Sequence, residues 1–134
     1  MQKVVWDESF NCGMAEIDKQ HKELVTILNE VIEKREDGVK SETVSSALMK
    51  LINYADYHFK AEEEYMKKIN YPEYINHKRE HIEFMRKTVE ICEDTMEYKE
   101  NVPEQLIVFI KNWVVNHIMQ SDRDIFIFSQ KEAV

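Results

Sequence analysis

Residues 58–81 read HFKAEEEYMKKINYPEYINHKREH. The link KKINY at 67–71 is polar, and the residue that follows it, Pro72, is well suited to the first turn of a helix. We therefore predict that one helix ends near residue 67 and that the next begins at 72. On each side of this break, two side chains that can bind metal stand four residues apart, about one helical turn: His58 with Glu62, and His77 with His81.

The remainder of the chain is also poor in turns. Two glycines and two prolines in 134 residues are too few for the tight turns of a sheet protein. Gly38 can end a helix before an N-cap at Ser41, and Pro103 can begin another helix. After an N-terminal arm at 1–13, we predict helices at about 18–37, 41–67, 72–98 and 103–120.

Each predicted helix has one apolar seam, with steps of three and four residues between its members. Four amphipathic helices joined by short links predict an all-α, up-down-up-down antiparallel four-helix bundle. We expect residues 1–134 to form one domain, with the metal-binding side chains at one end of its core.

Composition excludes several classes of protein. Hydrophobic residues make up 43% and the net charge is −8, which argues against a disordered chain and against a nucleic-acid binder. No apolar run has membrane-spanning length and the N-terminus lacks the apolar stretch of a signal peptide, so we expect a cytoplasmic protein. Two cysteines, Cys12 and Cys92, form no disulfide framework, and we expect free thiols.

All five histidines fall on the core-facing seams. A lone histidine on such a seam is usually a core residue bonded to a carbonyl group. Burying five imidazoles and a carboxylate without a common purpose costs on the order of several kcal/mol in unmet polar groups. In the run Glu62-Glu63-Glu64, only Glu62 has the inward phase, and the other two belong to a solvated face.

The antiparallel order brings these polar residues together. The first turns of the first and third helices share an end of the bundle with the last turns of the second and fourth. Seven side chains are therefore expected to converge there: His21, His58, Glu62, His77, His81, His117 and Asp122. His117 and Asp122 are five residues apart, which is not one α-helical face, so we predict that the helix loosens near residues 120–121.

Seven donors are too many for one ion and suit two, with the carboxylates bridging them. Imidazole combined with carboxylate oxygen favours iron, zinc or manganese. The absence of thiolate from the predicted cluster argues against an iron–sulfur centre.

This pattern resembles the ligand motif of the hemerythrin family: a lone His, His-x-x-x-Glu, His-x-x-x-His and His-x-x-x-x-Asp. The resemblance extends to Trp6, Gly13 with the run at 17–21, Tyr71-Pro72 and Trp113. The short form with an N-terminal arm is most similar to the single-domain bacteriohemerythrins of that family.

The resemblance implies reversible O2 binding at two iron ions with an oxo or hydroxo bridge, for oxygen carriage, storage or delivery, without enzyme activity. It implies that His77, His81 and His117 hold one iron, that His21 and His58 hold the other, and that Glu62 and Asp122 bridge them. It also implies an O2 pocket lined by Leu24, Trp113, Val114 and Ile118. A leucine is common where Val114 stands, which predicts a roomier pocket.

Other functions stay open at this point. Oxygen or redox sensing uses the same site, although sensors of the family are usually joined to a signalling domain for which we expect no room. The resemblance implies that the iron held by only two histidines, His21 and His58, keeps an open position where O2 binds. Reduction of peroxide or nitric oxide at this iron is a third possible function, and iron storage is poorly supported because no carboxylate-lined cavity is evident. We expect a monomer or small homo-oligomer, whose O2-consuming partner enzyme the sequence does not identify.

Overall fold

The computed structural model describes residues 2–11, 14–36, 41–96 and 104–132. The described elements are all helical. In chain order they are a 3-10 turn η1 (Glu8–Phe10), α1 (Ala15–Glu36), α2 (Ser41–Lys68), α3 (Tyr74–Met96), α4 (Glu104–His117), a π-helix η2 (Ile118–Asp122) and α5 (Arg123–Glu132).

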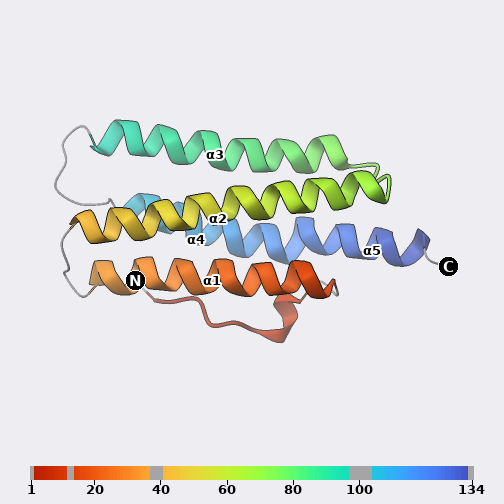
Figure 1. Cartoon of the computed structure of the whole chain (residues 1–134), viewed down its shortest axis with the longest axis horizontal. Helices are drawn as coiled ribbons and strands as arrows, with labels where there is room; N and C mark the ends of the chain where they lie inside the picture. The colour runs from red at the N-terminus through yellow and green to blue at the C-terminus, as the bar shows by residue number, and fades with distance from the viewer. Residues whose placement is uncertain (1, 12–13, 37–40, 97–103, 133–134) are drawn as a thin grey trace.

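The helices form an antiparallel four-helix bundle, which confirms the predicted fold class. Figure 1 shows α1 and α3 running in one direction, and α2 and α4 in the other. The arm before α1 lies along that helix (Figure 1), where the Asn29 side chain exchanges two 2.8 Å hydrogen bonds with the backbone of Val4. None of the described helices is long and apolar enough to cross a membrane.

The end of α2 explains the sharp reversal into α3. Asn70 has a φ of 56°, the left-handed conformation that often ends a helix, and the Tyr71 amide donates to the Met66 carbonyl at 2.9 Å. The third helix begins at Tyr74 and not at the predicted Pro72, because a turn closed by the Tyr74 amide and the Tyr71 carbonyl comes first.

The predicted C-terminal end of the last helix is wrong. We predicted a stop near residue 120, whereas α4 passes through η2 into α5 and reaches Glu132. The added helix has its own apolar contacts: Ile125 is fully buried, and the Phe128 ring lies 5.4 Å from that of Tyr71. Gly38, Pro103, Cys12 and the side chain of Cys92 lie outside the described residues.

Candidate metal centre

Seven polar side chains meet inside the bundle, in a core that is otherwise mainly apolar. His21 comes from the second turn of α1, and the others come from the C-terminal half of α2, the start of α3, the end of α4 and the end of η2. None of the seven residues is more than 5% exposed: His21, His58, Glu62, His77, His81, His117 and Asp122. They are not at the extreme end of the bundle, because α5 continues beyond Asp122.

The π-helix explains how Asp122 faces inward. In a π-helix the backbone bond runs from residue i to i+5, so residues five apart lie on one face. His117 and Asp122 are separated by that number, and His117 Nε2 lies 2.9 Å from Asp122 Oδ1. The loosening predicted near residues 120–121 is therefore confirmed, and it extends over Ile118–Asp122.

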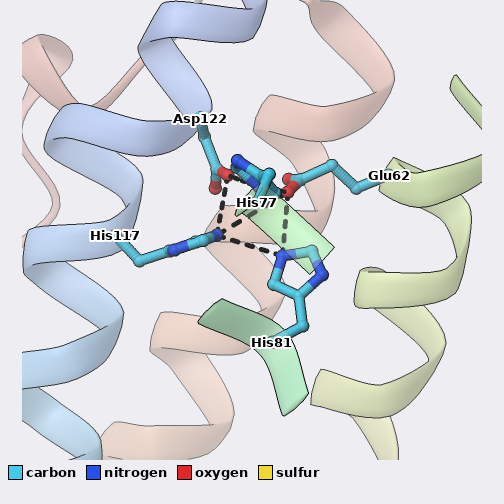
Figure 2. A group of neighbouring side chains, drawn as sticks. All are labelled: Glu62, His77, His81, His117 and Asp122. Carbon is cyan, nitrogen blue, oxygen red and sulfur yellow. Dashed lines mark hydrogen bonds and ion pairs between the residues drawn. The ribbon is translucent and has the colours of Figure 1, made fainter. Parts of the chain in front are cut away.

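One group of donors contains three histidines. His81 Nε2 lies 3.1 Å from both Glu62 Oε1 and His117 Nε2. His77 Nε2 lies 3.1 Å from Asp122 Oδ1 and also contacts Glu62 Oε1. Figure 2 shows these five side chains pointing toward one another, with His77 and His81 coming from α3 and the others from α2, α4 and η2.

The other group contains two histidines and the same two carboxylates. His21 Nε2 lies 2.8 Å from Asp122 Oδ2, and His58 Nε2 lies 3.3 Å from Glu62 Oε2. Glu62 therefore turns Oε1 to the first group and Oε2 to the second, and Asp122 divides its oxygens likewise. Within each group, one ligand atom per residue lies within 4.8 Å of all the others.

The positions of the donor atoms suit bound metal ions better than they suit hydrogen bonds among the donors themselves. Several are buried and make no hydrogen bond among the described residues, although they stand close together: His21 Nε2, His58 Nε2, Glu62 Oε2, Asp122 Oδ1 and Asp122 Oδ2. Buried polar atoms are normally paired. A six-coordinate ion with bonds of about 2.1 Å places adjacent donors about 3 Å apart, which matches the His81–His117 separation of 3.1 Å.

In the protein without metal, the donors form ion pairs. Burial raises the pKa of the Glu62 carboxyl, but close contacts with four histidines, His117 foremost, hold this pKa well below its usual range. Burial lowers the pKa of His77, but Asp122 and Glu62 together raise it to about 9. Protonated imidazoles therefore supply the positive charge that bound cations would otherwise bring.

Aromatic rings hold two of the histidines in place. Phe59 stacks on His81 with ring centroids 4.1 Å apart, and Trp113 stacks on His117 at 4.3 Å. Trp113 is half-buried and lies on the side of the three-histidine group. Leu24, Val114 and Ile118, the other residues of the expected O2 pocket, are buried in the apolar core.

The outer ring nitrogens have partners that we did not predict. Gln20, Glu63 and Glu80 lie 2.8, 2.9 and 3.4 Å from the Nδ1 atoms of His58, His81 and His117 respectively. The prediction that Glu63 belongs to a solvated face is wrong, since its side chain is only 17% exposed and reaches across to α3. A sequence signal existed, because each partner is the immediate neighbour of one of the seven residues.

Comparisons with known proteins agree with this geometry. A family model described as the hemerythrin HHE cation binding domain matches residues 12–127. A bacteriohemerythrin of Clostridium acetobutylicum is 31% identical over 124 residues, covering 90% of this chain and 96% of that protein. A hemerythrin-like protein of Naegleria gruberi is 36% identical over 117 residues, covering 87% of this chain and 86% of that one. The crystal structure of a wild-type hemerythrin matches with a TM-score of 0.80 and 28% identity, over 91% of this chain and 94% of that one.

Proposed function

We propose that this chain, which belongs to the hemerythrin family, binds O2 reversibly at a di-iron centre and serves in oxygen carriage, storage or delivery. The observation that carries the proposal is the division of the two carboxylates between two donor groups with unequal numbers of histidines. That division supports two ions of which one has fewer protein donors.

The residue roles follow from that division. We assign His77, His81 and His117 to one iron, His21 and His58 to the other, and Glu62 and Asp122 to both. When bound, the iron pair, with its oxo or hydroxo bridge, supplies the electrons and the open position that O2 needs. The chain itself holds the imidazole rings of His81 and His117 by stacking and keeps water from the donors by burying them.

The donor chemistry favours binding over oxidation of a substrate. Oxygen-activating di-iron proteins in similar bundles use four carboxylates and two Glu-x-x-His motifs. This site offers five neutral imidazoles and only two carboxylates, and so it stabilises higher oxidation states of iron less well. Leu24, Val114 and Ile118 are apolar and buried, and we propose that they line the O2 position with Trp113 at its margin.

The experiment is elemental analysis combined with optical spectra. We expect two irons per chain, and an absorption band that appears when O2 is admitted to the reduced protein and disappears when O2 is removed. A value near one iron, or zinc alone after iron reconstitution, contradicts the di-iron assignment. Turnover of peroxide or nitric oxide with no reversible band contradicts oxygen carriage.

A matched pair of variants tests the bridging role. Asp122→Asn removes the charge of a fully buried carboxylate, and we expect it to lower the iron content. Asp124→Asn makes the same change two residues away at an exposed position and should leave the iron content unchanged. Equal iron content in the two variants contradicts the assignment of Asp122.

A further inference from the structure

Two histidines of the site, His58 and His81, are hydrogen-bonded at their outer nitrogen to a side chain from another helix, and a third, His117, has a carboxylate near that nitrogen without a hydrogen bond. The contacts join Nδ1 to a side-chain oxygen at 2.8 Å for His58, 2.9 Å for His81 and 3.4 Å for His117. The long contact, to Glu80, is steadied from the other side, because the Ser121 hydroxyl donates to the same Glu80 oxygen at 2.7 Å.

These partners follow a regular order around the bundle. Gln20 stands next to His21 on α1 and reaches His58 on α2. Glu63 stands next to Glu62 on α2 and reaches His81 on α3. Glu80 stands next to His81 on α3 and reaches His117 on α4. Each of the first three helices therefore carries a donor and, beside it, the partner of a histidine on the next helix.

The partners differ in charge between the two donor groups. Glu63 and Glu80 are carboxylates, and both lie behind histidines of the three-histidine group. Gln20 is a neutral amide and lies behind a histidine of the two-histidine group. An ionised carboxylate only accepts hydrogen bonds, so the proton of His81 is directed to Nδ1 and the lone pair to Nε2, which faces the site. The Nδ1 atom of His117 makes no hydrogen bond, so Glu80 places its charge behind this ring without fixing the proton.

We propose that Glu63 and Glu80 are positioning residues that make the iron held by His77, His81 and His117 the more readily oxidised of the two. This rests on the di-iron function proposed above. A carboxylate behind a ligating imidazole makes it a stronger electron donor than an amide does, and outer hydrogen bonds and charge are among the factors that set a metal's reduction potential. Gln20 orients His58 without that added charge, so the iron with the open position keeps the higher potential.

The test measures the midpoint potential of the iron-loaded protein by optical redox titration. Glu63→Gln keeps an acceptor oxygen and removes the charge. We expect Glu63→Gln to lower the equilibrium constant for oxidation of the iron held by three histidines about tenfold. This change raises the midpoint potential of that iron by about 59 mV for a one-electron step. Glu80→Gln should shift the midpoint in the same direction by less, because its contact is longer and its side chain is 45% exposed. Gln20→Glu adds a charge behind His58 and should lower the midpoint potential of the iron held by two histidines.

Glu83→Gln is the control, because Glu83 is an exposed carboxylate on α3 that pairs with Arg86. It removes the same charge without touching a histidine, and we expect no shift. If Glu63→Gln and Glu83→Gln shift the midpoint equally, or if Gln20→Glu raises it, the proposal is overturned.

A second measurement uses no iron and no O2. In protein loaded with Co2+, competition with a chelator should show metal binding weakened about 10- to 100-fold by Glu63→Gln and unchanged by Glu83→Gln. Equal affinity in both variants counts against Glu63. If the wild type fails to take up two irons, the proposed function fails. If it takes up two irons and the variants leave the midpoint unchanged, only the role of Glu63 and Glu80 fails.

Discussion

The two halves of the bundle are buried equally well with opposite chemistry. In the apolar half, Leu28, Val31, Leu51 and Leu106 are each at most 1% exposed and belong to one hydrophobic cluster. In the metal half, around the seven polar residues, His21, Glu62 and Asp122 are likewise fully buried.

The difference shows that one half of a fold can be stable without metal ions while the stability of the other half depends on bound protons or metal ions. Burying an apolar side chain stabilises by about 1.5–3 kcal/mol whether or not metal ions are present. Burying imidazoles and carboxylates stabilises only when protons or metal ions balance their charges.

Metal removal should have the largest effect. Free metal at about a thousand times its dissociation constant stabilises the folded state by about 4 kcal/mol, so the chelated protein should melt well below the loaded one. Hydrogen exchange should show protection lost first near His21 and His117 and kept near Leu28. If the chelated and metal-loaded proteins melt at the same temperature, or if chelation lowers hydrogen-exchange protection equally in both halves, the two halves do not differ in their dependence on metal.

Truncation in the apolar half should lower stability without affecting metal. Leu28→Ala empties a fully buried site and should cost about 2–5 kcal/mol in the free energy of unfolding, measured by urea denaturation. Iron per chain should stay at the wild-type value at temperatures where the variant is folded. Iron lost in proportion to stability would mean that the halves are not independent.

Leu24→Ser tests the border between the halves. Leu24 lies one turn beyond His21 and is 2% exposed, so a hydroxyl there should admit water to the O2 position and speed decay of the oxygenated protein. Leu48→Ser is the control, since Leu48 is 3% exposed but lies ten residues before His58 on α2, about 15 Å along the helix. Equal acceleration by both variants would show that dryness near His21 is not what protects the oxygenated form.

The smallest effect should come from pH, and only in the metal-free protein. The raised pKa of His77, about 9, gives stability that is fully present below the unfolded value near 6.5 and is lost as pH rises through about 9. The depressed pKa of Glu62 gives stability that is present above its unfolded value of 4.5 and is lost as pH falls. In chelator, the free energy of unfolding measured with urea should therefore be highest between about pH 4.5 and 6.5. His77→Gln should reduce the loss of this free energy at alkaline pH by roughly 1–3 kcal/mol. If His77→Gln loses as much stability at alkaline pH as the wild type does, a group other than His77 is responsible for that loss.

Much of the site was predictable because its signals are local. Pairs such as His58 with Glu62 and His77 with His81 share a helical face through backbone geometry alone, and antiparallel order brings those faces to one region. The end of the last helix was less predictable: the inward turn of Asp122 follows from its spacing to His117, but the extension to Glu132 depends on packing such as that of Phe128 on Tyr71.

By itself, the sequence determined the helical bundle, the seven candidate donors and the family they resemble, because periodicity and spacing act within one helix. Only the tertiary structure decided how Glu62 and Asp122 divide their oxygens, and which side chains stand behind His58, His81 and His117. Those contacts join different helices, so they depend on the rotation of each helix about its axis. The packing of the whole core sets that rotation, and a spacing along one helix does not encode it.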